Sequence, residues 1–205
     1  MIPQRFVTEY PERCGQLLEM LEPQARDADL VGSFALLVAS AAFTIPFARM
    51  TEAKHPLGRP EPGLSGAIRR LRRVPFLEAP FWNGDVPEFF RYAKIVNDPE
   101  FTEGWSDEAG NHPISSTETK DGNTVLRTIR HALAHGNVVF LDENGHEKPG
   151  NQLRFLAFLS RHEDGKSHRV AIFGEEDFLT FLKAWIVWLQ TFPPECEFLF
   201  AEAAE

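Results

Sequence analysis

Residues 124–137 of this chain read Thr-Val-Leu-Arg-Thr-Ile-Arg-His-Ala-Leu-Ala-His-Gly-Asn. The apolar residues recur at the spacing of an amphipathic helix and predict one buried stripe, made of Val125, Leu126, Ile129, Ala132 and Leu133. The opposite side of the helix carries Arg127, Arg130, His131 and His135. No carboxylate within the segment neutralises this side, and like charges on neighbouring turns weaken a helix. The segment therefore predicts a helix that packs by one face and meets an anion or an acidic partner by the other.

The segments before this helix predict further helices. Two long ones are expected, over Glu9–Glu22 and from Asp29 to about Lys54, with Pro46 as a kink or an end in the second. Residues 55–116 are rich in proline, glycine and aromatic residues, which indicates a long irregular connection. Short helices are expected within this connection, over Ser65–Val74 and Val86–Val96.

The segments after this helix predict a small sheet and a closing helix. Gly136 has the position of a helix cap, and beyond it the apolar period changes to that of strands. Residues 138–173 are expected to hold three antiparallel strands, at Val138–Leu141, Leu153–Arg161 and His168–Phe173. The last helix follows the acids at 175–177 and ends before Pro193, with a loosely held tail over Glu197–Glu205. We expect residues 1–205 to form a single domain.

The composition is that of a globular protein, with 205 residues of which 43% are hydrophobic and 25% are charged. The two cysteines, Cys14 and Cys196, form no Cys-x-x-Cys pair, so neither a disulfide framework nor a zinc ribbon is expected. Residues 1–15 lack the apolar core of a secretion signal, and we expect a cytoplasmic protein. Leu30–Ala48 has no charged side chain, but its many small residues favour a buried central helix over a membrane span.

Arg130 and His135, with the polar His131 between them, match the arrangement Arg-polar-x-x-x-His. With this arrangement the chain resembles the HEPN superfamily, over Glu9–Lys54 and Thr124–Gln190. The resemblance implies dimers with a shared cleft and metal-independent cleavage of RNA. The expected fold class is therefore mainly α, a HEPN-like four-helix bundle with a small antiparallel sheet inserted between the motif helix and the last helix.

These residues suit RNA cleavage by the neighbouring 2′-hydroxyl. His135 can transfer protons near neutral pH, and Arg130 can hold phosphate oxygens and stabilise the developing charge. His131 can orient the phosphate or the second imidazole, and Arg127 extends the cationic strip. Arg130 and His135 point about 140° apart on an ideal helix, so we expect two antiparallel copies to complete the site, with Ala132 and Ala134 permitting close approach.

Two other interpretations of this helix stay open. The cationic side can be a solvated or interface surface without catalysis. His131 and His135 also have the spacing of two zinc ligands, but Ala132 stands where such enzymes need a glutamate, and no third ligand is obvious. We therefore expect no metal and no other cofactor.

A second basic cluster precedes the motif helix and consists of Arg69, Arg70, Arg72 and Arg73. It can follow an RNA backbone, and the alternative is a surface in which acidic residues neutralise it. The aromatic residues that follow can stack bases, although core packing is the simpler interpretation for Phe76, Phe81, Trp82, Phe89, Phe90 and Tyr92.

We expect a homodimeric, metal-independent endoribonuclease acting on RNA. The resemblance implies a toxin or defence role, with an antitoxin or regulator protein as a partner. The alternative is a non-catalytic HEPN-like module that binds nucleotides, RNA or an acidic protein through the same face. The net charge of −9 argues against the broad positive field of many nucleic-acid-binding proteins, so any binding has to be local.

Overall fold

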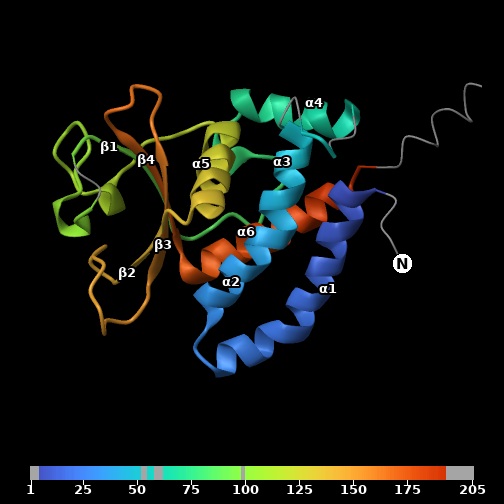
Figure 1. The fold of residues 1–205 in the computed structure, drawn as a ribbon, viewed down its shortest axis with the longest axis horizontal. Coiled ribbons are helices and arrows are strands. Elements are labelled where there is room, and N and C mark those ends of the chain that lie inside the picture. Colours follow the sequence, from blue (N-terminus) through green and yellow to red (C-terminus); the bar gives the residue numbers. More distant parts are fainter. Residues whose placement is uncertain (1–4, 52–54, 58–61, 98–99, 193–205) are drawn as a thin grey trace, which may run out of the picture.

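The computed structural model describes residues 5–51, 55–57, 62–97 and 100–192. Within them, a helical part packs beside an antiparallel sheet (Figure 1). The helices are α1 (Phe6–Asp27), α2 (Val31–Ala39), α3 (Ile45–Thr51), α4 (Pro62–Arg70), α5 (Gly122–His135) and α6 (Glu175–Gln190). The strands are β1 (Phe90–Ile95), β2 (Val138–Leu141), β3 (Phe155–Arg161) and β4 (His168–Gly174). The fold is therefore of mixed helix and sheet, where the sequence predicts a mainly α class.

The described strands pair in the order β1-β4-β3-β2, and every neighbouring pair is antiparallel. One face of the sheet carries the aromatic residues that meet the helices, and the other face packs against the segment between β1 and α5, including Trp105 and Ile114. In one row across the sheet, Arg169 lies between Lys94 of β1 and Ser160 of β3. These three side chains share a face because directly opposite residues of antiparallel strands point the same way.

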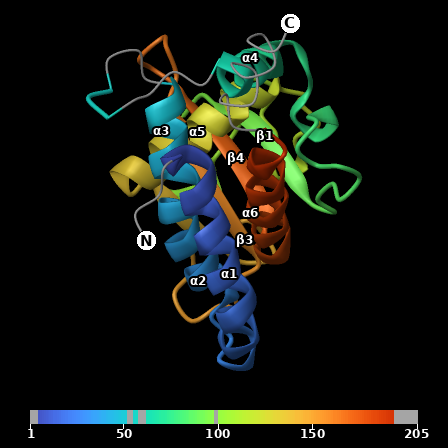
Figure 2. The same cartoon turned by 90° about the vertical axis from the view of Figure 1, so that its right-hand side faces the viewer.

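The helices lie on one side of the sheet. Figure 1 places α5 next to the sheet and α1 on the far side of the helical part, with α6 and α2 between them. Figure 2 shows α1 and α6 side by side in front of β3 and β4, and these two helices are in contact. A cluster of rings joins α6 to the turn that follows α2, where Phe43 meets Trp185 edge-on with ring centroids 5.3 Å apart. The motif helix is thus held between the sheet and the helical core.

The long apolar helix is continuous through Pro46 because a wider turn precedes the proline. Residues Ser40–Thr44 form a π-helical turn, and the N–H of Ile45 donates to the carbonyl oxygen of Ser40. Proline has no N–H to donate, and such a turn accommodates the missing bond without ending the helix. Val31–Thr51 is long and apolar enough to cross a membrane, and half of its most apolar part is buried inside the protein. Its inner side lies in the core, as expected for a central helix.

The structure corrects two of the predicted helices and the place of the sheet in the chain. Val86–Val96 is not a helix, because its second half forms β1 and pairs with β4. The sheet therefore draws a strand from the proline-rich connection and is not only an insertion after the motif helix. The first helix is longer than predicted, since α1 continues through Pro23.

Several other predictions are confirmed. The bounds of β2 agree with the prediction, and β3, β4, α4 and α6 each lie within a few residues of it. Pro193, the tail over Glu197–Glu205 and the end of the second helix at Lys54 lie outside the described residues. The aromatic residues after the second basic cluster are core residues, since Phe76, Phe81, Trp82, Phe90 and Tyr92 are buried.

Candidate nucleic-acid interface

The helix that carries the motif is fixed at both ends. The Asp121 carboxylate caps its first turn by accepting a hydrogen bond from the Thr124 N–H, with an oxygen–nitrogen distance of 2.9 Å. Gly136 ends the helix in the left-handed conformation, at φ 72°, which glycine adopts without steric cost. Val125, Ile129 and the rest of the predicted apolar stripe pack into the core, so α5 has little freedom to rotate.

We call Arg127, Arg130, His131 and His135 the α5 cationic face. Arg127 and His135 are exposed, while Arg130 and His131 are half-buried. The rings of His131 and His135 are neighbours, with centroids 6.2 Å apart and planes inclined by 52°. Arg130 precedes His135 by five residues and so lies on the other edge of this face, about 140° away. Within one chain, the structure therefore brings the imidazoles of His131 and His135 together. It does not bring Arg130 and His135 together.

The surroundings of His131 favour its neutral form. Partial burial is the main cause that lowers its pKa, and the positive charges of Arg130 and Arg127 lower it further. Within the part of the chain that the structure describes, Arg127, His131 and His135 form no ion pair with a carboxylate. The positive charge of the α5 cationic face therefore comes first from its arginines, Arg127 and Arg130, in a protein of net charge −9.

The spacing of His131 and His135 does not extend to a metal site. Among the described residues, no group of three or more histidine, cysteine, aspartate or glutamate side chains is arranged to hold a metal ion. A stable zinc site needs at least a third protein ligand beside two imidazoles. The geometry therefore gives the zinc interpretation of this pair no support.

The second basic cluster lies at the opposite end of α5. Arg69 and Arg70 are the last residues of α4, and Arg72 and Arg73 belong to the 3₁₀ helix that follows; all four side chains are exposed. Gly122, the first residue of α5, lies against Leu71 in this segment. Since α5 rises about 1.5 Å per residue, His131 lies about 14 Å and His135 about 20 Å along the helix from Gly122. Within the described residues, these arginines have no carboxylate partner, contrary to the interpretation in which acids neutralise them.

One more cation, Arg169, lies near this face and is not among the site residues predicted from the sequence. The hydroxyl of Ser160 in β3 donates to that of Thr128 in α5, at 3.4 Å, so this row of the sheet lies under the helix. Arg169 is the cross-strand neighbour of Ser160, and its positive charge contributes to the lowered pKa of His131. A charged residue at an inward-facing strand position is the pattern that points to it: Arg169 alternates with the buried Ala171 and Phe173.

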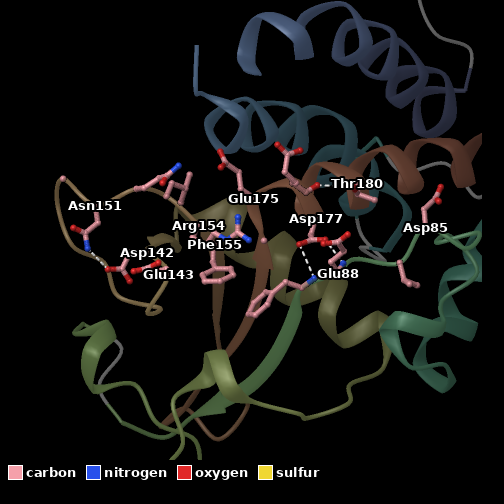
Figure 3. A pocket seen from close by; sticks show the side chains of 17 residues that line it. Asp85, Glu88, Asp142, Glu143, Asn151, Arg154, Phe155, Glu175, Asp177 and Thr180 are labelled. Atoms are coloured by element: carbon pink, nitrogen blue, oxygen red, sulfur yellow. Dashed lines mark hydrogen bonds between the residues drawn. The ribbon is translucent and has the colours of Figure 1, made fainter. Parts of the chain in front are cut away.

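A large hollow lies at the other end of the same strands. It has a volume of about 1540 Å³, and Figure 3 shows carboxylates projecting into it from several segments. The lining carries one guanidinium, that of Arg154, and seven carboxylates: Asp85, Glu88, Asp142, Glu143, Glu175, Glu176 and Asp177. Four of the carboxylates have a structural use: Asp142, Glu175 and Asp177 accept hydrogen bonds from backbone N–H groups, and Glu176 pairs with Arg26 of α1. This acidic hollow repels polyanions, and no residue of α5 lines it.

Comparisons of the chain with models of protein families, with characterised proteins and with solved structures found no match. The interpretation of the site therefore rests on its own residues and geometry.

Proposed function

We propose that this protein is an RNA-binding protein of mixed α and β fold, and that its α5 cationic face is the RNA-binding surface. More particularly, we propose a metal-independent endoribonuclease of the HEPN type. The observation that carries the proposal is the pair of neighbouring imidazoles, His131 and His135, on an exposed helix end without a carboxylate partner among the described residues. A phosphodiester supplies the negative charge that this surface lacks.

The pair has the parts that cleavage by the 2′-hydroxyl requires. His131, whose pKa is lowered, accepts the proton of the 2′-hydroxyl as its oxygen attacks phosphorus. The bond from phosphorus to the 5′-oxygen breaks, and the protonated imidazole of His135 gives its proton to this leaving oxygen. The products are a 2′,3′-cyclic phosphate and a 5′-hydroxyl, with no net change in protons. The guanidinium of Arg127 stabilises the charge on the non-bridging oxygens.

Arg130 takes part through a second copy of the chain in this proposal. It lies on the other edge of the α5 cationic face, so two antiparallel α5 helices place the Arg130 of each copy near the imidazoles of the other. Ala134 is exposed and permits close approach. Ala132 is buried and cannot contribute to such a contact, contrary to the prediction from the sequence. In this proposal α1, α2, α5 and α6 are the helices of a HEPN-like bundle; α1 and α2 contact α6, and α5 contacts the π-helical turn.

Cleavage of a mixed single-stranded RNA in EDTA tests the proposal. The wild type is expected to leave cyclic phosphate ends, and His131→Gln, His135→Ala and Arg130→Ala are each expected to lower the rate by about 10²–10⁴. Arg161→Gln is the matched control, because Arg161 is exposed on β3 in the opposite alternation to Ser160 and its loss removes an equal charge. RNA with 2′-O-methyl groups must resist cleavage. Full activity of all three variants would exclude this site.

The second candidate is a module that binds RNA without cleaving it. It is favoured by the position of the imidazole pair at the exposed end of α5, outside the large hollow, because enzymes usually enclose the reacting groups. Tight binding of the same RNA by a folded wild type, with no cleavage, would select this function.

A further inference from the structure

We propose that Arg169 forms a second phosphate-binding subsite beside the His131–His135 pair, and that the carboxylate of Glu163 occupies it until RNA displaces it. The inference rests on the proposed function in one respect, that the ligand of the α5 cationic face is RNA. It deepens that function by making the ligand an extended backbone with at least two phosphates in contact, one at α5 and the next at the sheet.

The position of Arg169 follows from the register of the sheet. Arg169 stands opposite Ser160, and the Ser160 hydroxyl bonds Thr128 one helical turn before His131. Arg169 and His131 therefore approach the same space from β4 and α5, and the charge of Arg169 acts on the imidazole. An RNA strand bound along the exposed end of α5 places its next phosphate near the guanidinium of Arg169.

The guanidinium of Arg169 has hydrogen-bond donors for a phosphate. Its side chain is 19% exposed, and its Nη2 donates to a carboxylate oxygen of Glu163. Its Nε is buried and has no acceptor among the described residues. A guanidinium matches the oxygens of a phosphate with two parallel donors, so a phosphate fits it better than the present single contact does.

Glu163 has the properties of a displaceable occupant. Its side chain is 71% exposed, and exposed ion pairs contribute little to stability. The guanidinium of Arg169 lowers the pKa of Glu163 to about 2, so the carboxylate is charged near neutral pH and competes with a phosphate for this guanidinium. The Nε2 of His162 lies 3.6 Å from a carboxylate oxygen of Glu163, so the displaced carboxylate can turn to this ring.

The neighbouring Lys94 is less suited to this role. Lys94 shares the row of Arg169, but its ammonium group contacts both Glu108, at 2.8 Å, and Asp164, at 3.4 Å. Asp164 is itself fixed by the N–H groups of Lys166 and Ser167. Two acids, one of them rigid, hold Lys94, whereas one exposed acid holds Arg169.

The test measures binding of a short, fluorescent, fully 2′-O-methylated single-stranded RNA by anisotropy, in EDTA and at several salt concentrations. Arg169→Gln is expected to bind about tenfold more weakly, as for the loss of a charge-assisted contact, and its salt slope should fall by about 0.7. Glu163→Gln is expected to bind several-fold more tightly. Arg161→Gln should match the wild type, because its equal charge is lost from the opposite face of the sheet.

The double variant Glu163→Gln/Arg169→Gln separates displacement from general electrostatics. If Glu163 acts by occupying Arg169, its substitution has no effect once Arg169 is absent. An equal gain in both backgrounds, or no gain in either, overturns the inference. Because Glu163 is exposed, the single variant Glu163→Gln still tests the inference if Arg169→Gln melts early, since binding no tighter than that of the wild type overturns it.

The outcomes also separate this inference from the proposed function. Normal cleavage of unmodified RNA by Arg169→Gln, with unchanged binding, overturns the subsite and leaves the nuclease. Binding that depends on Arg169 in a protein that cleaves nothing supports the subsite and overturns the nuclease. A wild type that does not bind the RNA overturns both.

Discussion

At the scale of single residues, the charge state of His131 matters most. Its ring is half-buried beside His135 and among arginines, and each of these features opposes protonation. A larger fraction of His131 is therefore neutral, and able to accept a proton near neutral pH, than of a histidine with an unperturbed pKa. This property belongs to the arrangement of the arginines as much as to the histidine.

Substitution of Arg127 by Gln is expected to raise the pKa of His131, because a nearby positive charge that opposes protonation is removed. The measurement is an NMR titration of the His131 ring in both proteins. If His131 is the base, the acidic limb of the pH–rate profile moves to higher pH by the same amount, since the base is inactive when protonated. Arg161→Gln is the control and should leave the titration in place. An unchanged His131 titration in Arg127→Gln would show that Arg127 has no electrostatic effect on the ring.

At the scale of elements, α5 is the part that the sequence predicts best. Its apolar stripe, its cationic face and its glycine cap are all local patterns, and each has the predicted place in the structure. The strand β1 could not be predicted in the same way, because Val86–Val96 allows a helical period and its partner β4 lies far along the chain. The role of Arg169 could not be predicted either, because it depends on which residues stand opposite Arg169 in the sheet.

The end of α5 at Gly136 provides a test of this element. Nothing lies within 4 Å of a methyl group added there, so Gly136→Ala tests backbone conformation alone. We expect a loss of about 1 kcal/mol in the free energy of unfolding, because alanine is strained at positive φ. Gly136→Asn should lose less, since asparagine tolerates this conformation. Urea denaturation measures both, and equal stability of the alanine variant and the wild type would contradict the explanation.

At the scale of the whole molecule, the acidic hollow lies at one end of β3 and β4, and Arg169 lies toward the other end, which we call the positive end. The acidic hollow lies where β3 begins and β4 ends, and Arg169 lies near the start of β4, roughly 17 Å away along the strand. The α5 cationic face adds to the positive end. The predicted homodimer and its partner proteins remain proposals, and this division of charge is a property of each single chain.

This division has a consequence for the speed at which RNA is captured. At about 0.01 M salt, electrostatic forces reach about 30 Å, and an approaching polyanion meets the repulsion of the net charge of −9. At about 0.1 M they reach about 10 Å, so the repulsion is screened while the positive end still attracts at close range. The association rate, followed by stopped-flow anisotropy, is therefore expected to rise and then fall as salt increases. A monotonic fall would mean that the positive end dominates at every distance. With the predicted maximum, RNA capture is fastest at an intermediate ionic strength.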